Sequence, residues 1–253
     1  MKSVDQWSNT INANITGSLR TGFKSNSIEF GNGVTQVVRP DNISAGIQIA
    51  EQQVSVSHTR TDWRQGDLVL TKQDRDYGIQ GQGLFILTEK VPAAPIAGSP
   101  QKLLYTRDGQ FHDDGAGHLR TNNGLYVVGR ADAITMGIFA GSAPPALTTY
   151  DSPEYFVLSQ PATLDQLTYS KYGSTIFENI LSSNTNTVDV SNNTLAGATN
   201  DFGSLKRTYL EASNVNIDKQ AAELSASNKY FDSLTKQFLV YISNIDASLG
   251  LFR

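Results

Sequence analysis

The stretch 217–249 reads IDKQAAELSASNKYFDSLTKQFLVYISNIDASL and determines how the C-terminal part of the chain folds. Apolar residues recur in it every seven positions, and further apolar residues follow three or four positions after them. A repeat of this kind places an apolar seam along one side of a long helix, as in a coiled coil. We therefore predict one helix from about residue 217 to residue 249. The predicted seam consists of Ile217, Leu224, Phe231, Leu234, Phe238, Tyr241, Ile245, Leu249 and Phe252.

A second, shorter amphipathic helix is predicted at the N-terminus. Its apolar residues follow helical spacing until Gly17 interrupts the pattern. These residues are Val4, Trp7, Ile11 and Ile15. The short helix can cover only about half of the long one, so the seam needs neighbouring chains for its burial. The alternative, in which both helices pack on the β-domain of their own chain, stays open.

Between the helices the sequence is typical of short strands and tight turns. Residues 47–56 alternate between apolar and polar, while Asp67-Leu-Val-Leu-Thr71 and Gly83-Leu-Phe-Ile-Leu87 are short runs rich in strand-forming residues. Asp108-Gly109 and Asn123-Gly124 are the dipeptides that two-residue hairpin turns favour, and each lies between two such runs. We expect a mainly β core built as a meander of hairpins.

Two stretches are predicted to be loops or linkers, because they contain little that could be buried. Residues 91–100 are rich in Pro, Ala and Gly, and residues 181–203 are dominated by Ser, Asn and Thr. The expected fold class is therefore α+β, mainly β. Its β-meander and hairpin core is joined to N- and C-terminal helices that pair as a coiled-coil-like helical domain.

Composition excludes several classes of function. The chain has 253 residues and a formal net charge of −4, so no basic surface for nucleic acid is expected. Cysteine is absent, which excludes disulfides, thiol nucleophiles and cysteine metal sites. Residues 1–10 lack the apolar segment of a secretory signal peptide, and no apolar run approaches the length that spans a bilayer. These features predict no membrane insertion; they fit a cytoplasmic protein, or one exported unfolded by a dedicated apparatus.

Two short patterns could carry chemistry, and neither is convincing. Ser233-Leu-Thr-Lys236 fits the S-x-x-K pattern of serine acyl-enzymes, but the companion S-D-N and K-T-G motifs are missing. His112-Asp-Asp114 and His118 could bind a metal, but the intervening glycines favour a solvated turn. We predict no catalytic residue, no metal site, no cofactor and no small-molecule substrate.

Several motifs, taken in order, resemble those of the bacterial flagellar axial proteins of the rod and hook type. Ser8-Asn-Thr-Ile-Asn-Ala-Asn14 and the later Thr21-Gly22-Phe23-Lys24 resemble the family's S-N-N-I-A-N…T-T-G-F-K signature, with a few extra residues between them. Tyr105-Thr-Arg-Asp-Gly-Gln-Phe111 is similar to its Y-T-R-x-G-x-F motif. Leu210-Glu-Ala-Ser213-Asn214-Val215-Asn216 matches L-E-x-S-N-V-N just before the long helix, where these residues can also cap it.

The resemblance implies a structural role and a discontinuous domain arrangement. In this family the terminal helices form an inner tube and the β-domains an outer shell. By that pattern, residues 1–30 and 205–253 would form the inner helical domain and residues 71–164 the outer β-rich domain. Residues 31–70 and 165–204 would connect the two.

The resemblance also implies partners and a location. Subunits of this family are exported unfolded by a type III apparatus and polymerise helically with their own kind and with other axial proteins. The chain length favours a rod subunit, located in the periplasmic part of the flagellar basal body. A subunit of a related non-standard extracellular or cell-surface filament is the first alternative, and a β-domain enzyme or carbohydrate-binding module is a distant one.

Overall fold

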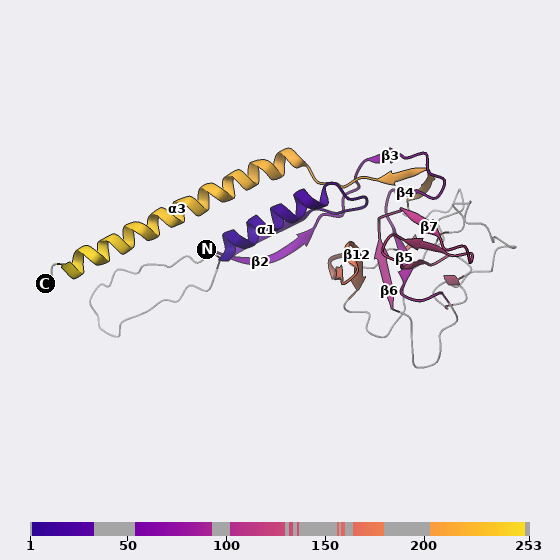
Figure 1. Ribbon diagram of the computed structural model, residues 1–253, viewed down its shortest axis with the longest axis horizontal. Helices are drawn as coiled ribbons and strands as arrows, with labels where there is room; N and C mark the ends of the chain where they lie inside the picture. Colours follow the sequence, from indigo (N-terminus) through magenta and orange to yellow (C-terminus); the bar gives the residue numbers. More distant parts are fainter. Residues whose placement is uncertain are drawn as a thin grey trace. The chain divides into compact units, whose positions relative to one another are not determined.

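The seven-residue repeat forms one continuous helix, as predicted. In the computed structural model of the chain, α3 spans Ile217–Gly250 (Figure 1). Asn216 caps its start, because the side-chain Oδ1 accepts a hydrogen bond from the backbone N of Lys219 at 2.9 Å. Asp218 lies in the first turn, where the helix dipole favours a negative charge. The seam residue Phe252 lies outside the described residues.

The structure describes residues 2–32, 54–92, 102–129, 132–133, 136, 156, 158–159, 164–179 and 203–250. The chain divides into two compact units. Unit 1 comprises residues 1–15, 26–62 and 216–253, and unit 2 comprises residues 16–25 and 63–215. Of the helices in the described part of the chain, none is both long and apolar enough to span a lipid bilayer.

Unit 1 contains both terminal helices and a two-stranded sheet. The N-terminal helix α1 spans Lys2–Gly17, and the strands β1 (Asn26–Asn32) and β2 (Val54–Thr61) pair antiparallel. Asn14 of α1 bonds to Gln220 near the start of α3, whereas Trp7 contacts Tyr230 further along α3. The two helices therefore run antiparallel, and the predicted pairing of the terminal helices is present.

Unit 2 is built around a largely antiparallel sheet in the order β11-β12-β6-β5-β9-β8-β7, with β10 also paired to β5. The strands of this sheet are β5 (Leu84–Thr88), β6 (Leu103–Thr106), β7 (Phe111–Asp113), β8 (Leu119–Thr121), β9 (Tyr126–Val127), β10 (Leu158–Ser159), β11 (Leu167–Ser170) and β12 (Gly173–Asn179). A short 3₁₀ helix, η2, spans Leu164–Gln166 before β11. Two smaller antiparallel pairs complete the unit: β3 (Leu68–Leu70) with β14 (Tyr209–Glu211), and β4 (Tyr77–Gln80) with β13 (Ser204–Arg207).

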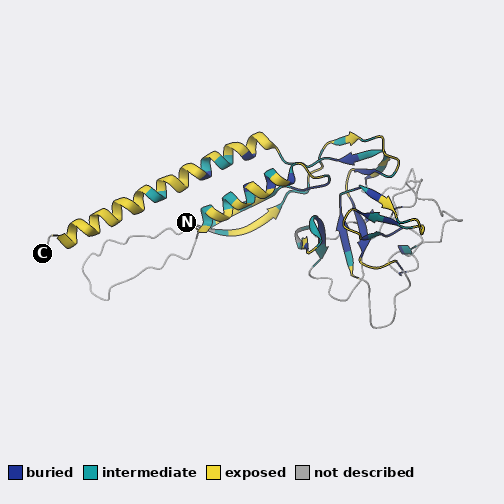
Figure 2. Cartoon of the chain, in the orientation of Figure 1, coloured by how far each residue is buried: buried dark blue, intermediate teal, exposed yellow. Residues whose placement is uncertain are grey.

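The strand β5 is buried on both faces and separates two apolar clusters. Phe85 and Leu87 point into one cluster, and Leu84 and Ile86 point into the other, as the alternation along a strand requires. In the first cluster the ring of Phe85 packs against Phe111 at 5.1 Å between centroids. The dark-blue strands in Figure 2 show that burial is concentrated in this sheet. The mainly β core predicted from the sequence is therefore present.

One predicted hairpin forms and the other does not. β8 and β9 pair across Asn123-Gly124, where Thr121 N donates to the carbonyl of Leu125 and residues 122–124 form a three-residue loop that ends in Gly124 with a φ of +79°. The hairpin predicted at Asp108-Gly109 is wrong, because β6 pairs with β5 and β12, and β7 pairs with β8. Gly109 instead lies against the carbonyl of Tyr77, where a Cβ would come within 1.7 Å of the oxygen.

Other predicted segments fall partly or wholly outside the described residues. The alternating run at 47–56 is described only from residue 54, where β2 begins, and most of the two expected loops, 91–100 and 181–203, is not described. The strands β11 and β12 belong to the main sheet of unit 2, although the sequence placed residues 165–204 in a connecting segment. The assignment of inner and outer domains remains a prediction.

We expect Phe85→Ala to lower the free energy of unfolding of unit 2 by about 3–5 kcal/mol, because it leaves a cavity between Phe111 and Phe156. Urea denaturation followed by circular dichroism measures the change. Phe85→Leu keeps most of the volume and should lose roughly 1 kcal/mol. Equal losses in the two variants would show that the site collapses freely around either side chain.

Candidate assembly surface and the buried junction

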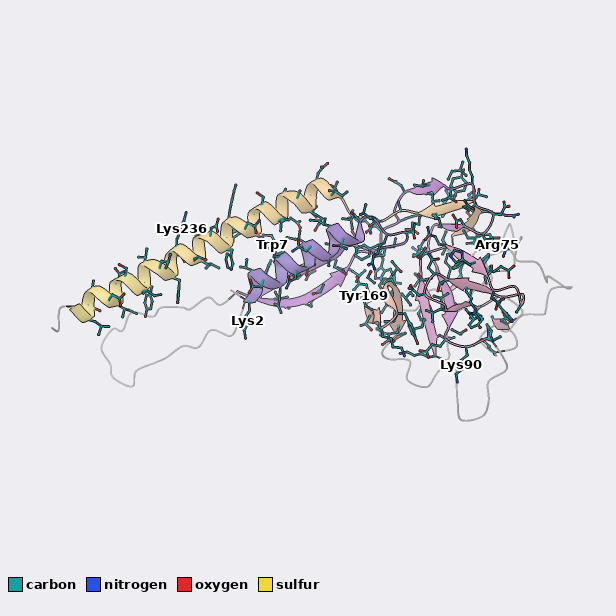
Figure 3. The ribbon with its side chains drawn as sticks, in the orientation of Figure 1. Lys2, Trp7, Arg75, Lys90, Tyr169 and Lys236 are labelled. Atoms are coloured by element: carbon teal, nitrogen blue, oxygen red, sulfur yellow. The ribbon has the colours of Figure 1, made fainter. Side chains whose placement is uncertain are left out.

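The second half of α3 is exposed on every side. Each residue from 236 to 250 is solvent-exposed, and the segment is yellow along its whole length in Figure 2. Lys236, labelled in Figure 3, marks where this exposed half begins. The exposed apolar side chains in this half are Phe238, Leu239, Val240, Tyr241, Ile242, Ile245 and Leu249.

The apolar residues of this half do not form a single stripe. Residues 238–242 are five consecutive apolar residues, and successive residues in an α-helix are rotated by about 100°. They therefore surround the helix completely, with exposures between 39% for Ile242 and 64% for Tyr241. A helix that is apolar all round is normally enclosed by other structure. This segment can be buried only if partners approach it from several sides.

The exposure follows from the lengths of the two helices. α1 has 16 residues and α3 has 34. The pairing of Trp7 with Tyr230 leaves only five residues of α1 to extend further along α3. The last partly buried residues of α3 are accordingly Leu234 and Thr235.

The predicted seam therefore divides into two parts. Ile11 is fully buried in unit 1, and Val4, Trp7, Ile15, Leu224 and Leu234 are partly buried. Ile217, Phe231, Phe238, Tyr241, Ile245 and Leu249 are exposed. Whether these residues form an assembly interface stays a prediction, but the exposed ones keep 41–64% of their surface open to solvent.

The motif segments of unit 2 meet at one buried carboxylate. Glu211 Oε1 lies 2.6 Å from Lys24 Nζ, and Glu211 Oε2 lies 3.0 Å from Arg107 Nη1. All three side chains are almost completely buried. Lys24 comes from the motif at 21–24, Arg107 from the motif at 105–111 and Glu211 from the motif at 210–216.

Every charged group of this buried junction has further hydrogen bonds. Lys24 Nζ donates to the carbonyl of Arg64 at 2.8 Å, and Arg107 Nη2 donates to the carbonyl of Gly81 at 2.6 Å. The backbone N of Gly66 donates to Glu211 Oε1 at 2.9 Å. Burial lowers the pKa of Arg107, and the Glu211 carboxylate acts in the opposite direction. Buried charges are tolerated in proteins when they are paired and hydrogen-bonded in this way.

Gly22 allows its own backbone to approach the backbones of Glu211 and Asp108 closely. Its N donates to the carbonyl of Glu211 at 2.8 Å, and its φ is +66°. A Cβ on Gly22 would come within 2.4 Å of the backbone N of Asp108. The neighbouring Thr21 donates through Oγ1 to Asp108 Oδ1 at 2.7 Å, so the motif is held by side-chain and backbone contacts together.

The motif Ser213-Asn214-Val215-Asn216 makes hydrogen bonds in both units, each within its own unit. Asn214 Oδ1 accepts a hydrogen bond from Ser25 N at 2.7 Å, and Asn214 Nδ2 donates to the carbonyl of Arg64 at 3.0 Å. Ser213 Oγ accepts from Val215 N at 3.3 Å. Asn214 therefore joins residues 25 and 64 in unit 2, and Asn216 caps the helix in unit 1.

The two patterns weighed for chemistry have ordinary structural surroundings. Ser233 is exposed, and the described residues that form the surface around it all belong to α3. Asp113 binds Arg75 at 2.7 Å, and Asp114 accepts hydrogen bonds from the backbone N of Ala116 and His118. These bonds lower the pKa of both carboxyls. Within the described part of the chain, no three His, Cys, Asp or Glu side chains are grouped to hold a metal ion.

Comparison with known proteins supports the flagellar interpretation. No family model matches the sequence. The chain is similar to the flagellar basal-body rod protein FlgG of Buchnera aphidicola subsp. Schizaphis graminum, with 25% identity over 243 residues that cover 90% of this chain and 87% of the relative. It is also similar to the flagellar hook protein FlgE of Caulobacter vibrioides, with 33% identity over 119 residues that cover 47% of this chain and 19% of the relative. The resemblance to flagellar axial proteins is confirmed.

Both flagellar relatives are named as structural proteins of the flagellum, a rod protein and a hook protein. Glu211 and Arg107 lie inside motif segments that this resemblance highlighted, yet the sequence analysis gave them no role. The available signal was a charged residue inside each motif: Glu211 between Leu210 and Ala212, and Arg107 between Thr106 and Asp108. One sequence alone does not show that these two side chains meet Lys24.

We expect Glu211→Gln to lower the free energy of unfolding of unit 2 by about 3–5 kcal/mol, because Lys24 and Arg107 would stay buried without a negative partner. Trp63 lies in unit 2 and the other tryptophan, Trp7, lies in unit 1. Urea denaturation followed by Trp63 fluorescence in a Trp7→Phe background therefore reports on unit 2.

The matched control is Glu178→Gln, which breaks a more exposed ion pair with Lys102 in the same unit. It should cost less than about 1 kcal/mol. A loss for Glu211→Gln no larger than for Glu178→Gln would show that the buried junction does not hold unit 2 together.

Proposed function

We propose that this protein is a structural subunit that polymerises helically into a tubular axial structure, the rod of the flagellar basal body. The observation that carries the proposal is the exposed half of α3, in which the consecutive apolar residues 238–242 surround the helix and are 39–64% exposed. The similarity to a rod protein over most of both chains supports the same function.

The energetics of the exposed half favour association. Fully burying a large apolar side chain is worth about 1.5–3 kcal/mol, so completing the burial of a half-exposed one is worth roughly 1 kcal/mol. Seven such side chains lie between residues 238 and 249. A subunit in a helical lattice contacts several neighbours, and each contact buries apolar side chains and so adds to the free energy of association. In this proposal Val4, Trp7, Ile11 and Ile15 hold the short helix, and the seam residues of α3 meet other copies.

The proposed arrangement assigns a position to each part of the chain. Residues 1–30 and 205–253 line the inner tube, and residues 71–164 form the outer β-rich domain together with β11 and β12. Residues 31–70 and the rest of 165–204 connect the two. The motif residues 21–24 and 213–216 hold the junction at which both chain ends leave the β-rich part. Their contacts with Asp108, Glu211, Ser25 and Arg64 support this role.

The rod is favoured over the hook because of how far each similarity extends. The match to the rod protein covers 87% of that relative, whereas the match to the hook protein covers 19% of a longer chain. The proposed partners are further copies of this chain, other axial proteins and the type III export apparatus. The proposed location is outside the cytoplasm, in the periplasmic rod. A related cell-surface filament is the alternative.

We propose no catalytic role. The hydroxyl of Ser233 lies on an exposed helix surface, and Lys236 is the one candidate base that its motif supplies. A serine in such a place lacks the oxyanion donors and the enclosed site that acyl transfer requires.

We expect Phe238→Asp and Val240→Asp each to abolish polymerisation, because they place a charge in an apolar contact on different sides of α3. Negative-stain electron microscopy and sedimentation measure polymer, and circular dichroism checks that the subunit stays folded. Gln237→Asp is the control: it adds the same charge next to Phe238 at an exposed position that is already polar, and should assemble normally. Normal filaments from Phe238→Asp would count against the proposed surface.

We expect Ser233→Ala, the pair His112→Ala/His118→Ala and treatment with a chelator to leave polymerisation and thermal stability nearly unchanged. The reason is that Asp113 and Asp114 are already bonded within their turn and Ser233 lies on an open surface. Filament yield and melting temperature are the measurements. Loss of filaments on chelation would reveal a structural metal, and stoichiometric labelling of Ser233 by an acylating probe would reopen the question of catalysis.

A further inference from the structure

The side-chain amide of Asn14 connects three elements of unit 1. Its Nδ2 donates to the backbone O of Asn26 at 2.7 Å and to Gln220 Oε1 at 3.1 Å, and its Oδ1 accepts from the backbone N of Asn26 at 2.8 Å. Asn14 is 1% exposed and Gln220 is 7% exposed. A buried amide with all these bonds joins α1 and the first residue of β1 to α3.

Gln220 lies seven and fourteen residues before Ser227 and Leu234, and so extends to the start of α3 the second series of positions of the seven-residue repeat. This series continues through Ser227, Leu234 and Tyr241. Its first two members are polar and buried, whereas the later two are apolar, with Leu234 partly buried and Tyr241 exposed. Within this series the two polar members are therefore the buried ones, and the apolar Tyr241 is left exposed.

Apolar burial alone would favour a different pairing. Sliding α1 by one heptad, about 10 Å along α3, would bring Asn14 beside Ser227 and move Trp7 from Tyr230 to the region of residue 237. Val4, Trp7 and Ile11 would then meet the more apolar part of α3. Such a shift breaks the bond between Asn14 and Gln220 and leaves Gln220 buried or facing solvent without its partner.

We propose that the Asn14–Gln220 pair fixes the register of α1 on α3 and so determines which part of α3 stays available. A single buried polar position can specify the register of paired helices, at some cost in stability. The consequence for assembly rests on the proposed function: the pair keeps residues 236–250 free for the apolar helix segments of further copies of this chain. Asn14 is thus a positioning residue for that surface.

Engineered cysteine pairs measure the register directly, since the chain contains no cysteine. Trp7→Cys with Tyr230→Cys reports the observed register, and Trp7→Cys with Gln237→Cys reports the register shifted by one heptad. Each pair is treated with a short bis-maleimide at a concentration where light scattering shows no polymer. Intramolecular cross-links are quantified by mass spectrometry, in the native background and in the Asn14→Leu/Gln220→Leu background.

In the native background the first pair should cross-link at least about tenfold more than the second, as expected for a buried polar pair lost on shifting. In the double-leucine background the two yields should come within about threefold of each other. A swapped pair, Asn14→Gln/Gln220→Asn, keeps both amides and should keep the native preference. An unchanged tenfold preference in the double-leucine variant overturns the proposal.

A folding check and an assembly measurement complete the test. Circular dichroism shows whether the double-leucine variant keeps its helices. If it does not, the single variant Gln220→Leu is used for the cross-linking test, because Asn14 keeps its bonds to Asn26 in it. An unchanged tenfold preference in Gln220→Leu would then overturn the proposal. Filament yield, measured without cysteines, should fall in the double-leucine variant. A changed register with no filaments even from the native chain would support the register-fixing pair and reject the proposed polymer.

Discussion

The mismatch in length between the two terminal helices is the constraint on which the rest of unit 1 depends. α3 has 34 residues and α1 has 16, and the antiparallel pairing begins at the start of α3, where Asn14 meets Gln220. Residues 236–250 are therefore exposed to solvent in the described part of the chain. Exposed apolar side chains in water are unfavourable, so under the proposed function this geometry leaves the burial of α3 to be completed by other chains.

The buried junction in unit 2 differs from α3, because all of its charged groups have partners within the same chain. Glu211 comes from the segment that leads into α3, and Lys24 comes from the segment that follows α1. Arg107 belongs to the segment between the main-sheet strands β6 and β7. Two cations and one carboxylate, all hydrogen-bonded, hold the entering and leaving segments against the same β framework. The β body can thus be fully formed while the distal part of α3 still lacks neighbours.

Features encoded locally could be predicted from the sequence, and those that depend on distant residues could not. The repeat of α3 and the Asn123-Gly124 turn depend on residues close together in the chain, and both are present. Asp108-Gly109 has the same kind of turn signal, but its glycine is needed for close approach to Tyr77, about thirty residues earlier. The ion pair of Lys24 with Glu211 joins residues 187 positions apart. The motifs marked the right segments, yet no spacing rule could identify the partners.

The distribution of charge along α3 indicates how many partner helices its apolar segment needs. Lys219, Glu223, Lys229, Asp232 and Lys236 lie in the first part of the helix, and no charged residue occurs from 237 to 245. A two-stranded pair needs an apolar stripe on one side only and tolerates charges on the others. Residues 238–242 are apolar around the whole circumference, so one partner helix would leave part of them in water. Enclosure by several neighbours, which a helical lattice provides and a closed dimer does not, is therefore the arrangement that the proposed function requires of this segment.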